Sequence, residues 1–183
     1  ALPHGRDRSY VDLKLVRSFF AGTRFFNALH FSLLQYRCCN YMTLVQRSPD
    51  KILYQQNQKS DSVYIVLQGC VGAFRKKAGV EEERQENNGK GTFVQEYTAG
   101  MVLGENTVTG KINAERRRTE TIATRGSNKA TLARLLATNY VEVTDTLEST
   151  LRDILRLKSW QRKPEHIDLL CEFFEGEVSV CLV

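Results

Sequence analysis

One stretch of the chain, GENTVTGKINAERRRTET at residues 104–121, holds the side chains best suited to bind a polar ligand. Glu105 is a carboxylate that accepts hydrogen bonds from hydroxyl groups, and Arg116, Arg117 and Arg118 follow within 13 residues. A guanidinium pairs with phosphate oxygens through directed N–H donors, so the stretch offers partners for a hydroxyl group and for an anion. Neither the GE pair nor the RRR run alone decides between a solvated loop and a ligand site, because both patterns are common.

The composition of the chain is that of a globular domain. Hydrophobic residues make up 42% and charged residues 26% of its 183 residues, which is enough for one domain and the start of another. The net charge of +5 is too diffuse to predict nucleic-acid binding, and we expect no nucleic-acid partner. Of the functions considered, a nucleic-acid interface is therefore the least favoured; it would be built from Arg116, Arg117, Arg118 and Arg125.

Several functional classes lack their signature residues. The sequence shows no paired carboxylates, nucleophile–histidine pair or metal-ligand spacing, so no enzyme activity, catalytic residue, metal site or cofactor is predicted. Five cysteines without a CxxC pair, and without a signal peptide, favour a reducing, cytoplasmic compartment. No apolar run approaches the ~18 residues that cross a bilayer, so direct membrane insertion is not expected. The chain starts without Met and ends within a hydrophobic run, which favours a piece of a longer protein.

The predicted elements follow the order helices, strands, helix. Apolar residues at helical spacing predict helices within residues 10–37, with a break at Gly22. Across residues 38–140, short segments rich in β-branched and aromatic residues alternate with turns, which predicts an antiparallel barrel of about eight strands. The first of these strands is expected at residues 41–45. A polar insert at residues 76–91 has little to bury and is expected to be a long mobile hairpin loop.

Helical periodicity returns near the end of the chain. It predicts a helix over residues 141–157, capped by Thr144 or Asp145. Residues 158–183 carry a further helical pattern that Gly176 is expected to end. This last stretch either extends the preceding helix or opens a second domain.

Three segments share an order and spacing known from one protein family. ILYQQNQKSDSVYIVLQGCV at 52–71 contains a strand, a polar turn, an aromatic strand and a Gly; AGMVLGEN at 99–106 is similar to Gly-x-x-Phe-Gly-Glu. RTETIAT at 118–124 is similar to Arg-(Ser/Thr)-Ala-x-(Val/Ile)-x-Ala. Over about residues 10–157 the chain thus resembles the cyclic-nucleotide-binding domains of catabolite activator protein, protein kinase A regulatory subunits and cyclic-nucleotide-gated channels. The resemblance implies a jelly-roll barrel, a double-stranded β-helix, with N-terminal helices and a C-terminal lid helix.

The same resemblance implies a regulatory module that binds a cyclic nucleotide and controls an effector outside these residues. Carried over to this sequence, Glu105 would bind the ribose hydroxyl, Arg118 would bind the phosphate, and Gly104 would let the backbone approach. Thr119 follows the arginine as in members that favour cyclic GMP, so the ligand is cyclic GMP or cyclic AMP with a slight lean to cyclic GMP. The implied ligand-binding residues are Leu103, Gly104, Glu105, Asn106, Arg118, Thr119 and Glu120. The implied lid candidates are Leu151, Ile154, Leu155 and Leu157.

The sequence departs from the family pattern around this site. Leu103 replaces a Phe, Asn106 replaces an aliphatic residue, and Asn57 stands where a turn Gly is expected. Glu120 replaces an Ala and brings a carboxylate near the phosphate site. A like charge there opposes binding unless it is neutralised or turned away.

Two alternatives follow from these departures. Glu105 and Arg118 lie 13 residues apart, a few more than is usual in the family, so Arg116 or Arg117 is an alternative phosphate ligand. The alternative function is a degenerate barrel that binds no nucleotide and acts as a protein-interaction module. Residues 158–183 resemble the helix that precedes a barrel in the same family, so the second domain would be a second copy.

Overall fold

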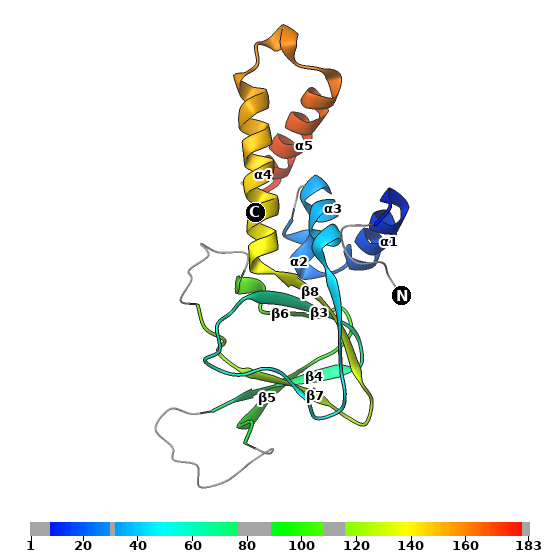
Figure 1. The fold of residues 1–183 in the computed structure, drawn as a ribbon, viewed down its shortest axis with the longest axis vertical. Helices are drawn as coiled ribbons and strands as arrows, with labels where there is room; N and C mark the ends of the chain where they lie inside the picture. The colour runs from blue at the N-terminus through cyan, green and yellow to red at the C-terminus, as the bar shows by residue number, and fades with distance from the viewer. Residues whose placement is uncertain (1–7, 30–31, 77–88, 108–115, 181–183) are drawn as a thin grey trace. The chain divides into compact units, whose positions relative to one another are not determined.

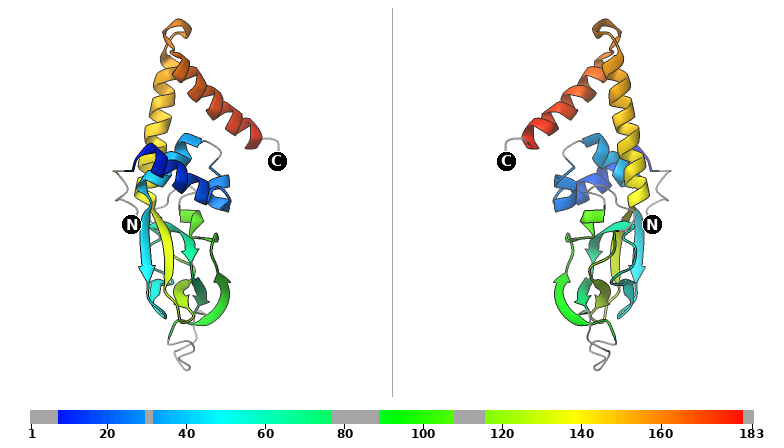
Figure 2. Two further views of the ribbon diagram at one scale, coloured as in Figure 1. Left: turned by 90° about the vertical axis from the view of Figure 1, so that its right-hand side faces the viewer. Right: turned by 90° about the vertical axis from the view of Figure 1, so that its left-hand side faces the viewer.

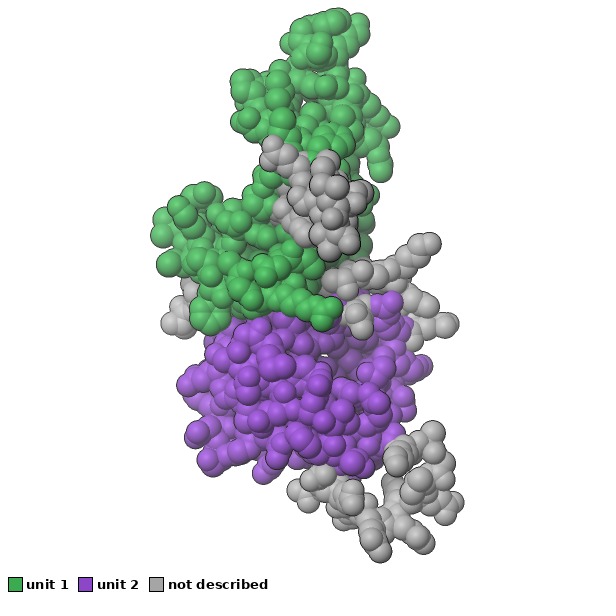
Figure 3. Space-filling view, turned by 180° about the vertical axis from the view of Figure 1, so that it is seen from behind, with its two compact units in different colours: residues 1–41, 138–183 green, residues 42–137 purple. Residues whose placement is uncertain are grey.

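The structure of the chain, a computed structural model, describes residues 8–29, 32–76, 89–107 and 116–180. Two compact units make up the chain (Figure 3): one contains residues 1–41 and 138–183, and the other contains residues 42–137. In the described residues, all strands belong to the second unit, and the first unit is helical. Most of the predicted loop, residues 77–88, lies outside the described residues.

The helical unit contains three helices that precede the strands in the chain. They are α1 (Tyr10–Phe20), α2 (Arg24–Asn27) and α3 (Ser32–Tyr41) (Figure 1). A capping box starts α1, in which the Ser9 hydroxyl accepts from the Asp12 N–H and the Asp12 carboxylate accepts from the Ser9 N–H. The predicted break at Gly22 is confirmed, because this residue lies between α1 and α2.

Helix α4 (Ala137–Arg156) begins at the residue that follows the last strand. The predicted start at residue 141 is therefore wrong, as is the predicted cap at Thr144 or Asp145. Thr144 lies inside the helix, and its hydroxyl donates to the carbonyls of Tyr140 and Val141 at 3.1 and 2.9 Å. A Thr inside a helix satisfies its hydroxyl through the carbonyls of the preceding turn in this way. The presence of a residue type that favours helix caps therefore did not identify the start of the helix.

Helix α5 (Pro164–Val180) is separate from α4. A short 3₁₀ turn, η3 (Ser159–Gln161), lies between them, and Figure 2 shows the two helices diverging from it. The predicted end at Gly176 is wrong, because the helix continues through this residue; a glycine inside a helix costs only about 1 kcal/mol relative to Ala. In the described part of the chain, every helix falls short of the length and apolarity that a bilayer crossing requires.

The strand unit consists of two four-stranded antiparallel sheets, as predicted for a jelly-roll barrel (Figure 1). The strand order is β1–β8–β3–β6 in one sheet and β2–β7–β4–β5 in the other. The first strand begins at Thr43 rather than residue 41, because α3 extends to Tyr41, and the two-residue β6 was not expected as a strand. The strands are β1 (Thr43–Arg47), β2 (Ile52–Tyr54), β3 (Ser62–Gln68), β4 (Cys70–Arg75), β5 (Thr92–Tyr97), β6 (Val102–Leu103), β7 (Thr121–Arg125) and β8 (Ala130–Leu136).

Apolar side chains from both sheets fill the barrel. The buried cluster includes Val66, Val71, Ile122 and Leu132, none more than 1% exposed. Gly69 joins β3 to β4 with φ of 78°, and a Cβ there would lie 2.8 Å from the Lys129 carbonyl oxygen. Only glycine fits this hairpin, as its sequence context predicted.

Candidate functional site

Gly104 turns the chain from β6 into the short 3₁₀ helix η2 (Glu105–Thr107). Leu103 pairs with Tyr64 of β3 and is 2% exposed, so this predicted ligand residue lies in the core. Gly104 has φ of 71°, which glycine adopts without strain, and its carbonyl accepts from the Thr107 N–H at 2.9 Å. The turn therefore presents Glu105, which is half-buried, at the first position of η2.

A short backbone ladder directs Arg118 toward the barrel interior. Its N–H donates to the Gln58 carbonyl, and its carbonyl accepts from the Asn57 N–H, both at 2.8 Å. Successive side chains of an extended segment point to opposite sides, so Arg118 is 5% exposed while Arg117 faces solvent and donates to the Asn57 carbonyl at 3.0 Å. Asn57 has φ of 69°, so it keeps the left-handed backbone that the expected Gly would supply.

The barrel wall satisfies only part of the Arg118 guanidinium. Nη2 donates to the Ser62 carbonyl at 2.7 Å and lies 3.4 Å from a carboxylate oxygen of Asp61. The guanidinium carbon lies 4.1 Å from the centre of the Tyr54 ring, within cation–π range. Nε and Nη1 are buried and have no hydrogen-bond partner among the described residues. An anion would supply acceptors to these two nitrogens.

Gly104 and this guanidinium are in close contact. A Cβ at position 104 would collide with Nη1 of Arg118 and would lie 3.1 Å from the Ser62 carbonyl oxygen. Nη1, which has no partner among the described residues, is therefore beside the turn that leads into Glu105. The predicted hydroxyl acceptor and the predicted anion partner belong to the same site.

Glu120, the carboxylate expected to oppose an anion, is neutralised by an ion pair. Its Oε1 lies 2.7 Å from Nη2 of Arg75, which comes from β4. Burial, with the charge of Glu120 as a smaller cause, raises the pKa of Tyr97. Burial also raises the pKa of Tyr54, where the charge of Arg118 acts in the opposite direction. Both phenols are therefore neutral at physiological pH.

Gly104, Glu105, Arg118 and Glu120 line one cleft of about 550 Å³, a volume within the range of small-ligand sites. The structure brings together every predicted ligand residue except Leu103, which lies in the core, and Asn106, whose side chain lies outside the described part. Arg75, Asp61, Tyr54 and Tyr97 were not predicted, and no local motif marks them. The lining residues are Tyr54, Ser60, Tyr97, Val102, Gly104, Glu105, Thr107, Arg116, Arg117, Arg118, Thr119 and Glu120.

The four lid candidates belong to the helical unit and differ in exposure. Leu151 and Ile154 are buried in a cluster with Leu170 of α5. Leu155 is 49% exposed, and Leu157 is half-buried. Leu151 and Ile154 thus pack within their own unit, and Leu155 is the most accessible of the four.

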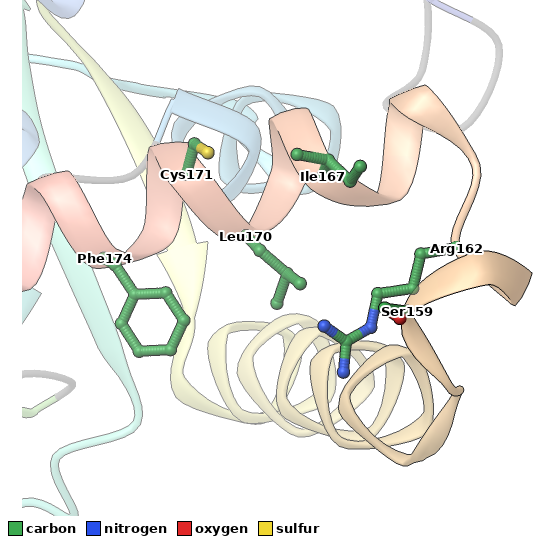
Figure 4. Close-up of a pocket in the computed structure, with 6 residues that line it drawn as sticks. All are labelled: Ser159, Arg162, Ile167, Leu170, Cys171 and Phe174. Atoms are coloured by element: carbon green, nitrogen blue, oxygen red, sulfur yellow. The ribbon is translucent and has the colours of Figure 1, made fainter.

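A hollow of about 520 Å³ lies beside α5 in the helical unit (Figure 4). Arg162 closes one end of it and donates through Nη2 to the Leu155 carbonyl at 3.1 Å, near the end of α4. The hollow offers mainly apolar surface, which suits packing rather than a polar ligand. Its lining residues are Ser159, Arg162, Ile167, Leu170, Cys171 and Phe174.

Comparison with known proteins identifies the fold. No protein-family model matches the sequence, and no curated protein matches it. The regulatory domain of Toxoplasma gondii protein kinase A, solved with cAMP, superposes with a TM-score of 0.56 at 16% identity, over 77% of this chain and 50% of that one. The regulatory subunit of a cAMP-independent protein kinase A from Trypanosoma brucei gives 0.53 at 14% identity, over 76% of this chain and 46% of that one.

The chain thus spans about half the length of each of these two structures. At these levels of identity the likeness concerns the fold. It agrees with the two antiparallel sheets and the flanking helices described above. The chain therefore has the cyclic-nucleotide-binding fold of protein kinase A regulatory domains.

Proposed function

We propose that the strand unit senses a cyclic nucleotide and that it regulates an effector outside these residues. The observation that carries the proposal is Arg118, which is 5% exposed and yet has two donor nitrogens without partners among the described residues. A guanidinium retained for structure alone is expected to have its donors satisfied, because an unsatisfied buried donor costs about 1–3 kcal/mol. A phosphate in the cleft supplies the missing acceptors.

The other cleft residues suit the rest of such a ligand. The Glu105 carboxylate accepts from a ribose hydroxyl, in a charge-assisted hydrogen bond. Glu120 does not oppose the phosphate, because Arg75 compensates its charge at 2.7 Å. Tyr54 and Tyr97 add aromatic surface for a base. The similarity to a regulatory domain solved with cAMP supports the proposal.

The choice of nucleotide rests on Thr119, which is exposed and lines the cleft. Its hydroxyl can contact the amino group of guanine, which favours cyclic GMP slightly over cyclic AMP. We also propose that residues 158–183 open a second copy of the domain.

One observation favours the alternative function, a barrel that binds no nucleotide and serves as a protein-interaction module. Arg118 is already held by the Ser62 carbonyl at 2.7 Å and by Asp61 at 3.4 Å. The similar Trypanosoma brucei subunit belongs to a cAMP-independent kinase, so the fold is not tied to one ligand.

Thermal unfolding with and without each cyclic nucleotide at millimolar concentration tests the proposal. A ligand at ~100 times its dissociation constant adds about 2.7 kcal/mol, which raises the midpoint by several degrees. We expect Arg118→Met to abolish the shift, since Met fills the same space without donors. Arg117→Met removes an equal charge from the same cleft, but from an exposed side chain, and serves as the matched control.

The pattern across variants separates the phosphate ligands. Glu105→Gln is expected to weaken the shift without removing it, because an amide oxygen still accepts a hydrogen bond. Loss of the shift in Arg117→Met with retention in Arg118→Met would transfer the phosphate role to Arg117. A folded protein whose midpoint neither nucleotide changes would favour the interaction module instead.

A further inference from the structure

The connection between α4 and α5 gathers all the basic residues of this part of the chain. Residues 137–151 contain three acidic residues and no Lys or Arg, and residues 164–180 contain five acidic residues and no Lys or Arg. Residues 152–163, here called the basic tip, contain one acidic residue and five basic residues. The five are Arg152, Arg156, Lys158, Arg162 and Lys163. Two acidic helices thus meet in a basic tip (Figure 2).

Most of the positive charge of the basic tip is open to solvent. Four of its five basic side chains are exposed, and Arg162 is half-buried. Arg156 lies 3.5 Å from a carboxylate oxygen of Asp153, and Lys163 lies 3.9 Å from a carboxylate oxygen of Glu165. Ion pairs between exposed side chains are weak, so these two cations remain available to another anion. The basic tip therefore presents an excess of positive charge to a partner.

Two large apolar side chains are exposed within the same tip. Trp160 is 77% exposed and Leu155 is 49% exposed. The ammonium of Lys158 lies 5.1 Å from the centre of the Trp160 ring, so a cation and an aromatic ring are adjacent. Trp is enriched at the level of lipid headgroups, and clusters of Lys and Arg are attracted to anionic lipids. This combination therefore suits the boundary between water and a lipid bilayer.

Hydrogen bonds within the basic tip fix its conformation. In η3 the Lys158 N–H donates to the Gln161 side chain at 3.0 Å, and the Gln161 N–H donates to the Lys158 carbonyl at 2.9 Å. The Arg162 guanidinium donates to two carbonyls in the last turn of α4, at 3.3 and 3.1 Å. Basic side chains commonly satisfy the last carbonyls of a helix in this way. Trp160 is thus presented on a turn that is formed before any partner binds.

We propose that the basic tip binds the surface of a membrane that contains anionic lipids, with Trp160 at the level of the headgroups. An extended anionic plane attracts the tip and repels the acidic residues of α4 and α5, so the two helices approach it tip first. This arrangement needs no helix that crosses the bilayer. A short acidic peptide would not use the separation of charge along the helices. A nucleic acid would find a single aromatic residue in the tip for base stacking.

Flotation of the 183-residue chain with vesicles, in the absence of nucleotide, tests the proposal. Vesicles of phosphatidylcholine that contain about 30% phosphatidylserine are compared with vesicles of pure phosphatidylcholine. We expect binding to be at least about tenfold weaker on the neutral vesicles, and to weaken as salt is added, because salt screens exposed charges. Trp160 is the only tryptophan in the sequence, so its emission reports on the tip directly. The emission is expected to shift to shorter wavelength as the indole leaves water.

Substitutions of exposed residues locate the contact without threatening the fold. Lys158→Gln is expected to weaken binding to the anionic vesicles about fivefold, as the loss of one charge near such a surface does. The matched control is Lys14→Gln, which removes one exposed charge from α1 of the same helical unit and is expected to leave binding unchanged. Trp160→Ala is expected to weaken binding to the same vesicles, because the apolar part of the contact is lost.

Three results would overturn the proposal: equal binding to the two kinds of vesicle, equal weakening in Lys158→Gln and Lys14→Gln, or binding without a change in tryptophan emission. Absence of binding to either vesicle would also overturn it, and would leave an acidic protein as the partner of the basic tip. Because the vesicle assay contains no nucleotide, its failure has no bearing on the cleft that contains Arg118.

Discussion

Replacing Gly104 by Ala tests the contact on which the candidate site depends. Gly104 has φ of 71°, and a Cβ at this position would collide with Nη1 of Arg118. The added methyl group therefore has two effects: it strains the backbone, and it displaces a guanidinium that the barrel wall holds. A second glycine separates the two effects, because Gly100 has φ of 88° and nothing within 4 Å of its Cβ position.

The expected magnitudes follow from the contacts that each substitution removes. Both substitutions place an Ala in the left-handed region, at a cost of about 1–2 kcal/mol each. Only Gly104→Ala also disturbs Arg118, which loses its charged hydrogen bond to Ser62, worth about 1.5–3 kcal/mol, and part of its contact with Tyr54, worth about 1 kcal/mol. We expect Gly104→Ala to be about 2–4 kcal/mol more destabilising than Gly100→Ala.

Urea unfolding of both variants, followed by circular dichroism, gives the two free energies. Combining Gly104→Ala with Arg118→Met removes the group that the methyl group strikes. The double variant is expected to recover most of the difference between the two glycine variants. Equal destabilisation by the two alanines would refute the contact between Gly104 and the guanidinium, and with it the geometry of the site.

Three further outcomes are expected. Arg75→Gln is expected to change the unfolding free energy by less than about 1 kcal/mol. In titrations it is expected to weaken nucleotide binding several-fold, because the charge of Glu120 is then uncompensated. Adding Glu120→Gln to this variant is expected to restore the affinity. Burial raises the pKa of Cys39 to about 12, so this thiol is expected to lower stability by about 1.4 kcal/mol per pH unit above about pH 9, where it ionises only in the unfolded chain. Burial also raises the pKa of Cys38, which adds its own decline, so Cys39→Ala is expected to reduce the slope by about 1.4 kcal/mol per pH unit rather than abolish it. Urea unfolding at pH 7.5, 9.0 and 10.5 checks this, and an equal slope in the protein with and without Cys39→Ala would contradict it. Leu170 lies in the core of the helical unit, so Leu170→Ala is expected to lower the free energy of urea unfolding by about 2–4 kcal/mol. Phe174 is half-exposed on the same helix, so Phe174→Ala is expected to lower it by less than about 1 kcal/mol. Similar losses in the two variants would contradict the packing of α5 on α4.

The order of the elements was predictable because hydrophobic periodicity is local. The segment SVYIVLQ predicted a strand and forms β3 (Ser62–Gln68) with the same bounds. Boundaries were less predictable where capping residues lie inside helices, as Thr144 does, or where a helix crosses a glycine, as α5 crosses Gly176. Two residues of β6 carry too little pattern to be recognised, and the strand exists because it pairs with Tyr64 and Ile65.

The grouping of the candidate site residues was predictable where they are neighbours in sequence. Gly104, Glu105 and Arg118 come from one continuous stretch, and the structure places all three around one cleft. Tyr54 lines the cleft and Arg75 pairs with Glu120 only after the sheets form, so no local spacing pointed to either residue. The effect of Glu120 could not be judged from its position beside the arginines, because its charge is compensated by Arg75 from another strand.

Arg118 also distinguishes the two functions proposed for this fold. Burying a cation under two tyrosines, Tyr54 at 4.1 Å and Tyr64 at 5.8 Å, is an unfavourable way to fill a core, because a hydrophobic side chain of similar volume is often more stable there. A barrel used only as a protein-interaction surface gains nothing from this cost. A barrel that binds an anion recovers it when the ligand reaches Nε and Nη1. Retained or increased stability in Arg118→Met, together with loss of nucleotide binding, would show that the arginine serves the ligand rather than the fold.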